Sequence, residues 1–192
     1  WLDLPLDVQG AIIETESLRA YDPAENPEQR PQEILQETIE KILDKIEESH
    51  RPVLSPGNGV RLAGAIEEFH ELVDVLGVPV VTGMSRVDAL ESDHPYFVGR
   101  SGGTGTRPGN FALRNSDVLL SIGNRQGFAQ TGFQYQDWAR ESYTILNDID
   151  ENELKKPNLH VSLPAVGDAG ELIRGLLAGA KKRGAAKEKQ VF

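Results

Sequence analysis

The segment 117–123 constrains the fold of this chain more than any other. It reads Asp-Val-Leu-Leu-Ser-Ile-Gly, and its apolar run is continuous rather than alternating. Parallel strands that are covered by helices on both faces carry such runs, whereas a strand with one solvated face alternates apolar and polar side chains. We therefore expect a buried strand in the interior of a parallel sheet.

Short apolar runs and helical patterns alternate along most of the chain. Strands are expected at 52–55, 78–82, 96–98, 117–123, 143–148 and 160–163, and amphipathic helices at 32–49, 60–76, 110–115 and 168–181. Alternation at this spacing requires right-handed crossovers and an open parallel sheet. The sequence predicts an α/β fold of three layers, with about six parallel strands in a doubly wound, Rossmann-like arrangement.

Composition limits the partners and the chemistry. The 192 residues carry 30 acidic and 20 basic side chains, a formal charge of −10, which argues against nucleic acid or an anionic membrane as a partner. Cysteine is absent, so disulfides and thiolate catalysis are excluded. No apolar run reaches the roughly 18 residues of a spanning helix, and no signal peptide is visible. We expect a cytoplasmic protein.

The two ends of the chain differ from its middle. Residues 1–6 form an apolar stretch typical of a strand already under way, and residues 20–31 hold three prolines and many charges, as a linker does. We expect a fragment whose opening segment belongs to a preceding domain. The alternative is a free-standing module whose opening segment completes its own sheet. The expected parts are 1–15 (preceding domain), 16–31 (linker), 32–181 (main domain) and 182–192 (tail).

The loop Gly57-Asn58-Gly59 follows the first expected strand and precedes a helix. Ligands of doubly wound sheets bind at the carboxyl ends of the strands, and free amides at a helix N-terminus can hold a phosphate. Glycines also serve simply as tight turns between a strand and a helix. Both interpretations stay open for this loop.

Ordinary NAD binding is not expected. The dinucleotide fingerprint requires a third glycine at position 62, which is leucine in this chain. The second strand ends in Thr82, Gly83 and Met84, so it supplies no acidic residue for a ribose.

A glycine-rich loop, residues 99–110, holds five glycines in twelve residues. Glycines permit a close approach of the backbone to a ligand, and Arg100 and Arg107 can contact phosphate. The centre of this loop is Gly103-Thr104-Gly105. The alternative is a flexible surface loop, and we favour a binding role because the flanking runs are apolar.

Two further loops follow the strongest strands. Gly123 and Arg125 come after the first of them, where an arginine can hold a pyrophosphate or pair with a carboxylate. Asp148 comes after the second, where a carboxylate suits ribose hydroxyls. Asp150 and Asp168 precede helical patterns, and we expect both to be N-caps.

No catalytic or metal-binding grouping is visible. The four histidines are scattered, with no pair at metal-ligand spacing, and no Gly-x-Ser-x-Gly motif occurs. We therefore expect no catalytic residue and no metal ligand in this chain.

Several motifs follow one another in a fixed order. They are His94-Pro95, Gly99, Gly105, Asn110-Phe111-Ala112, Ser116-Asp117-Val118-Leu119-Leu120, Gly123-Asn124-Arg125, Thr131-Gly132, the DIDxxEL pattern at 148–154 and Gly167-Asp168-Ala169. In this order they resemble the central domain of thiamine-diphosphate-dependent enzymes of the acetolactate synthase large-subunit type. The resemblance covers nearly the whole chain. Residues 1–9 resemble the last strand of the pyrimidine-binding domain that precedes the central domain in this family.

The resemblance implies a fold of the DHS-like NAD/FAD-binding type and a mainly structural role. In the family, thiamine diphosphate and Mg²⁺ are bound by the flanking pyrimidine- and diphosphate-binding domains, the latter through a Gly-Asp-Gly motif that this chain lacks. The intact enzyme would be a homo-oligomeric transferase or lyase acting on a 2-oxo acid. This chain would then not catalyse the reaction by itself.

In some members of the family the central domain binds FAD or another adenine nucleotide. Carried over by position, the FAD contacts fall at Gly57, Asn58, Gly59, Thr82, Gly83, Met84, Gly103, Thr104, Gly105, Gly123, Arg125, Asp148 and Asp168. Acetolactate synthases carry Met-His where this chain has Gly103-Thr104, and acidic residues with a second arginine where it has residues 126–129. Both differences remove side chains that hold the flavin. An ADP-type nucleotide and an empty site are the alternatives to FAD.

Overall fold

The computed structural model describes residues 3–25 and 33–184. The chain divides into two compact units, Trp1–Arg30 and Pro31–Phe192. Each unit is described by itself. Among residues 3–25 and 33–184, no helix combines the length and the apolar composition of a membrane-spanning segment.

Within residues 3–25, the described part of the first unit, there are three short helical segments: helix α1 (Leu6–Gln9) and the 3₁₀ turns η1 (Thr15–Ser17) and η2 (Pro23–Glu25). The expected opening strand is wrong where the structure describes it, because residues 3–5 have no regular structure and α1 begins at Leu6. Pro5 stands at the N-cap of α1 with φ −54°, and proline cannot donate to a strand ladder. Trp1 and Leu2 lie outside the described residues.

The second unit contains a sheet of six parallel strands in the order β3-β2-β1-β4-β5-β6. The strands are β1 (Pro52–Pro56), β2 (Val80–Thr82), β3 (Phe97–Arg100), β4 (Val118–Ile122), β5 (Tyr143–Asp148) and β6 (Leu163–Val166). This is the doubly wound order, in which the direction of strand addition across the sheet reverses between β1 and β4 while all strands stay parallel. The expected α/β class and the six parallel strands are confirmed. β4 is buried at every position, as its continuous apolar run predicts.

The two edge strands are short. β3 and β6 have four residues each, the pairing of β3 with β2 contains a register shift, and β6 contains Pro164. β6 begins three residues later than expected because side chains replace the regular ladder before it. The Thr144 amide donates to Ser162 Oγ at 3.1 Å, and Thr144 Oγ1 donates to the carbonyl of His160.

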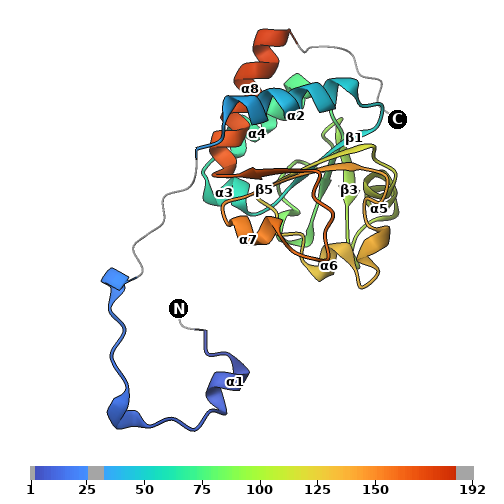
Figure 1. Cartoon of the computed structure of the whole chain (residues 1–192). Helices are drawn as coiled ribbons and strands as arrows, with labels where there is room; N and C mark the ends of the chain where they lie inside the picture. The colour runs from blue at the N-terminus through green and yellow to red at the C-terminus, as the bar shows by residue number, and fades with distance from the viewer. Residues whose placement is uncertain (1–2, 26–32, 185–192) are drawn as a thin grey trace. The chain divides into compact units, whose positions relative to one another are not determined.

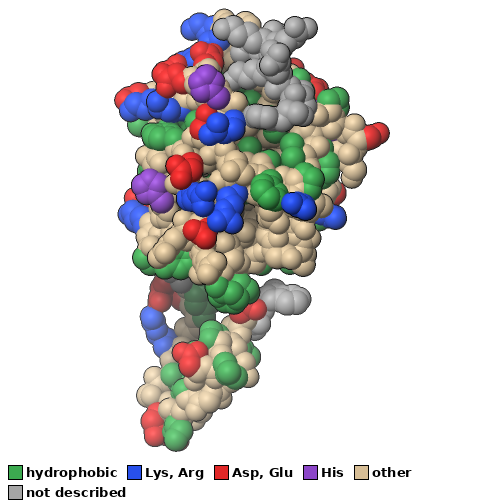
Figure 2. Space-filling model, turned by 90° about the vertical axis from the view of Figure 1, so that its right-hand side faces the viewer, with side chains coloured by type: hydrophobic (Ala, Val, Ile, Leu, Met, Phe, Trp, Pro, Cys, Tyr) green, Lys and Arg blue, Asp and Glu red, His purple; other side chains and the backbone are tan. Residues whose placement is uncertain are grey.

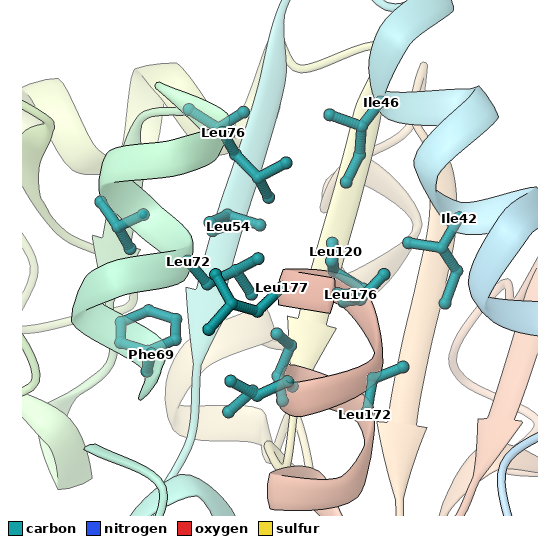
Figure 3. Close-up of a cluster of buried hydrophobic side chains, with 14 of the residues drawn as sticks. Ile42, Ile46, Leu54, Phe69, Leu72, Leu76, Leu120, Leu172, Leu176 and Leu177 are labelled. Carbon is teal, nitrogen blue, oxygen red and sulfur yellow. The ribbon is translucent and has the colours of Figure 1, made fainter. Parts of the chain in front are cut away.

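One face of the sheet is covered by three helices, α2 (Gln36–Glu48), α4 (Ile66–Leu76) and α8 (Ala169–Arg183) (Figure 1). Figure 3 shows the packing: α8 projects leucines between the inward faces of α4 and α2. The buried side chains shared by these helices and the sheet include Ile42, Phe69, Leu120 and Leu172, all with no exposed surface. Burial of such side chains supplies most of the stability of this layer.

The other face carries helix α5 (Arg107–Arg114) and a smaller cluster formed by Val53, Val81, Leu113, Leu119 and Ala139. α5 begins three residues before the expected position 110 because Thr106 is its N-cap. The Thr106 hydroxyl accepts a hydrogen bond from the Gly109 amide at 3.3 Å, and Pro108 lies in the first turn, where its missing N–H costs nothing. The second unit therefore has the three layers that the sequence predicts.

The single helix expected at 60–76 is wrong. The structure has two helices, α3 (Gly59–Leu62) and α4, separated by Gly64 at φ +63°. Glycine adopts this left-handed conformation without strain, so it ends the first helix. Leu62 consequently lies at the surface with 80% exposure.

Asp117 ties the beginning of β4 to the connection between α2 and β1. Its Oδ1 accepts hydrogen bonds from Ser49 Oγ and from the amide of Arg51 at 2.9 Å, and its Oδ2 accepts one from the amide of His50 at 2.8 Å. Burial disfavours the charged carboxylate, but these hydrogen bonds and the charge of Arg51 outweigh it and lower the pKa of Asp117. The Asp117 side chain therefore holds the start of β4 against the residues that lead into β1.

Candidate functional site

The loops after β1 and β4 touch each other at the point where the strand order reverses. The amide of Gly57 donates to the carbonyl of Ile122 at 2.8 Å, and the amide of Gly59 donates to the carbonyl of Gly123 at 2.9 Å. A Cβ atom on Gly57 would lie 2.1 Å from the Gly123 carbonyl oxygen. The tight-turn interpretation explains both glycines, since their amides are already used and are not free to hold a phosphate.

A cavity of about 640 Å³ opens at this carboxyl edge of the sheet. The loops after β1, β2, β4, β5 and β6 all contribute to its wall. Seven predicted site residues line it: Asn58, Gly59, Met84, Gly123, Arg125, Asp148 and Asp168. Six do not line it: Gly57, Thr82, Gly83, Gly103, Thr104 and Gly105. The structure therefore brings about half of the predicted residues together at one cavity.

The short helix α6 (Phe128–Thr131) forms part of the cavity wall. Ala129 and Gln130 of this helix line the cavity. The Ala129 carbonyl also accepts a hydrogen bond from the Gly103 amide at 3.1 Å. Thr104 Oγ1 lies 3.7 Å from Met84 Sδ. The glycine-rich loop after β3 therefore packs against α6 and the β2 loop rather than facing the cavity.

Carboxylates line the cavity at its β5 and β6 end. Asp148 Oδ1 accepts a hydrogen bond from the Asp150 amide at 3.0 Å. Asp168 Oδ1 accepts hydrogen bonds from the Gly170 and Glu171 amides at 2.9 and 3.0 Å, which caps α8. Asp150 caps the short helix α7 (Glu151–Leu154) through the Asn152 amide. The predicted N-cap roles of Asp150 and Asp168 are confirmed.

Arg125 is the cation of the cavity wall, and its charge is already paired. Its guanidinium donates to Glu153 Oε1 at 2.6 Å, while Lys156 Nζ donates to the carbonyl of Arg125 at 2.9 Å. The hydrogen bond from Arg125 lowers the pKa of Glu153, burial raises it, and the contact with Lys156 lowers it further, so the shift is downward. Acidic and basic side chains also lie next to one another on the face seen in Figure 2.

A buried polar cluster lies beneath the β4 loop. Gln126 Nε2 donates to Ser121 Oγ at 2.8 Å, and Asn124 Nδ2 donates to Ser55 Oγ at 3.4 Å. Gln126 is 2% exposed, adopts φ +48° and leaves its Oε1 without a partner among the described residues. Both side chains belong to residues that line the cavity. Asn124 is part of the Gly123-Asn124-Arg125 loop that the sequence singles out, whereas Gln126 was not predicted. The sequence feature that could have indicated this polar cluster is a serine inside each of two buried strands, Ser55 in β1 and Ser121 in β4.

The cavity has the size of a small-molecule site. Its volume falls in the range of about 300–1,000 Å³ that is typical of ligand and cofactor pockets. Within 3–25 and 33–184, no group of three or more histidine, aspartate or glutamate side chains is placed to hold a metal ion.

Comparison with known proteins identifies the family of this chain. Residues 39–176 match the family described as "Thiamine pyrophosphate enzyme, central domain". A probable acetolactate synthase large subunit of Methanocaldococcus jannaschii is 37% identical over 185 residues, 92% of this chain and 30% of the relative. One from Methanococcus aeolicus is 38% identical over 132 residues, 69% of this chain and 22% of the relative. The isozyme 2 large subunit of Escherichia coli is 31% identical over 132 residues, 68% of this chain and 24% of the relative.

The chain spans less than a third of the length of each of these relatives. The matched residues run from the first buried position of α2 to the core of α8 and include the whole sheet. The predicted resemblance is confirmed: this chain belongs to the family of thiamine pyrophosphate enzyme central domains, with acetolactate synthase large subunits among its relatives.

Proposed function

We propose that the chain is the central, non-catalytic domain of a thiamine-diphosphate-dependent transferase or lyase that acts on a 2-oxo acid. The match of residues 39–176 to the central-domain family carries this proposal. The described residues do not fit a thiamine diphosphate–Mg²⁺ site, since they hold no metal-binding group and the sequence has no Gly-Asp-Gly motif. The flanking domains of a cytoplasmic, homo-oligomeric enzyme would bind that cofactor.

In this proposal residues 1–15 end the preceding pyrimidine-binding domain, 16–31 form the linker, 32–181 form the central domain and 182–192 form a tail. Two observations support the division. The first unit ends at Arg30, and the six strands of the described sheet all lie between Pro52 and Val166. The described part of the opening segment adds no strand to the sheet, which favours the fragment over the free-standing module.

The experiment uses the intact protein that contains this chain. With thiamine diphosphate and Mg²⁺ added, we expect it to release CO₂ from pyruvate or another 2-oxo acid and to require both additions. The 192-residue chain alone, at the same concentration and with the same additions, is expected to release none. An intact protein that binds thiamine diphosphate but releases no CO₂ from any 2-oxo acid tested would contradict the proposal.

We further propose that the cavity binds an adenine nucleotide, FAD or an ADP-type ligand. Asn58, Arg125 and Gly127 line the cavity. Their backbone amides make no hydrogen bond within the described residues, so they are donors available to phosphate oxygens. Asp148 uses Oδ1 for the Asp150 amide, and its second oxygen can accept from a ribose hydroxyl.

Replacing Asp148 by alanine is expected to weaken ADP binding to the chain by about 10-fold, the size of one lost charge-assisted hydrogen bond. Asp150→Ala is the matched control, because Asp150 caps α7 and does not line the cavity. Isothermal titration calorimetry of both variants measures the effect. Equal weakening by the two substitutions would show that Asp148 acts only through the loop.

A further inference from the structure

We propose that a second cavity, beside the amino ends of β5 and β6, binds a small aromatic carboxylate. The inference is independent of the proposed nucleotide site, because the two cavities share no lining residue.

The second cavity has a volume of about 400 Å³, within the range of about 300–1,000 Å³ that is typical of small-molecule pockets. Its wall consists of residues from the segment 135–140, Thr144 near the start of β5, and residues 157–160 before β6. The first cavity is lined by Asp148 at the other end of β5. Thr144 precedes Asp148 by four residues of strand, a span of roughly 13 Å, so the two cavities lie toward opposite edges of the sheet.

The wall of the second cavity carries positive charge and no carboxylate. Among the described residues, no aspartate or glutamate lines it, although the chain as a whole has 30 acidic and 20 basic side chains. Arg140 and His160 do line it. Arg140 Nε lies 3.5 Å from Glu141 Oε1, and the two side chains are 47% and 70% exposed. An ion pair this exposed is weak, so the guanidinium remains available to an anionic ligand.

Two consecutive backbone amides of this wall also lack acceptors. The amides of Ala139 and Arg140 make no hydrogen bond within the described residues. Ala139 is 3% exposed and adopts φ +45°, a strained conformation for a residue with a Cβ atom. Such strain persists where the surroundings impose it and is found preferentially at ligand sites. Two free amides beside a guanidinium match the oxygens of one carboxylate.

Two aromatic side chains, Tyr135 and Trp138, supply the apolar part of the wall. Trp138 is half-buried and packs against the cluster of Leu146, Leu154 and Leu159. Its Nε1 is buried and has no hydrogen-bond partner among the described residues, which is uncommon for a buried donor. A flat ring packs well against aromatic side chains. The ligand that uses the whole wall therefore joins a planar apolar ring to a carboxylate.

Trp138 also provides the readout, because the chain has one other tryptophan, Trp1. In a Trp1→Phe chain, titration with benzoate is expected to change the Trp138 fluorescence along a saturable curve. Benzamide has the same shape without the charge, and acetate has the charge without the ring. Each should bind at least about 10-fold more weakly than benzoate, the size of one lost charge-assisted hydrogen bond or one lost ring contact.

Arg140→Ala removes the cation and should weaken benzoate binding by about 10-fold, while Arg140→Lys should retain part of the affinity. Arg174→Ala is the matched control, since Arg174 lies on α8 and lines neither cavity. It should leave the affinity within about twofold of wild type. Thermal unfolding confirms that each variant is folded.

A linear or absent response to benzoate would overturn the inference. Equal affinities for benzoate and benzamide, or an Arg140→Ala chain that binds benzoate as tightly as wild type, would do the same. Displacement of benzoate by ADP would place benzoate in the first cavity and overturn the inference as well. Failure of the benzoate titration leaves the nucleotide site standing, because ADP calorimetry tests that site separately.

Discussion

Gly57→Ala is expected to lower the free energy of unfolding by about 3 kcal/mol or more, the upper end for inserting a methyl group into a packed site. The new Cβ would lie 2.1 Å from the Gly123 carbonyl oxygen and 2.4 Å from Asn124 Cα. Both are backbone atoms, so no rotamer change can relieve the contact. The loops after β1 and β4 would have to separate, which breaks the hydrogen bond from Gly57 to Ile122.

Urea unfolding and thermal unfolding measure this effect. For a domain of this size the midpoint should fall by roughly 10 °C. Gly103→Ala is the control, because no atom lies within 4 Å of its Cβ position, and its stability should stay within about 0.5 kcal/mol of wild type. A Gly57→Ala chain as stable as the control would show that the two loops do not touch.

Asp117→Asn should lower the free energy of unfolding by about 2 kcal/mol at neutral pH. The carboxylate accepts from Ser49 and from the amides of His50 and Arg51. An asparagine must turn its NH₂ group toward at least one of these donors and leaves it unsatisfied. Asp93, an exposed residue with no hydrogen bond or ion pair among the described residues, provides the control, Asp93→Asn.

The same substitution predicts a pH dependence. Because the folded pKa of Asp117 lies below its ordinary value, the carboxylate contributes stability above the unfolded value of about 3.9 and loses it as the pH falls through the folded pKa. The difference between wild type and Asp117→Asn should therefore be largest near neutral pH and shrink in acid. Denaturant titrations across this range measure it. A difference that grows toward acid would contradict the hydrogen-bonded carboxylate.

The fold was predictable where the apolar pattern of one strand or helix indicates that element by itself. The continuous apolar run of β4 and the apolar stripe of α8 correspond to buried elements in the structure. The expected helix over 60–76 failed because Gly64 adopts a left-handed conformation, and periodicity does not report backbone angles. The expected strand near Pro5 failed because a strand requires a neighbour, which apolar composition alone does not supply.

The site was predictable only in part, for a related reason. The rule that ligands bind at strand ends indicates the loops after β1, β4 and β5, and Asp148 and Arg125 do line the cavity. The contacts between loops depend on tertiary structure: Gly57 against Gly123, and Gln130 against Gly83. No local pattern shows that a glutamine in one loop fills the space above a glycine in another.

The two short edge strands determine how readily the folded domain pairs with other molecules. An exposed strand edge can recruit a strand from another molecule, and natural sheets limit this with short edge strands, irregular pairing and proline. β3 has four residues and a register shift, and β6 has four residues and contains Pro164. Neither edge offers a long, regular row of hydrogen-bonding groups, so the folded domain should resist edge-to-edge aggregation.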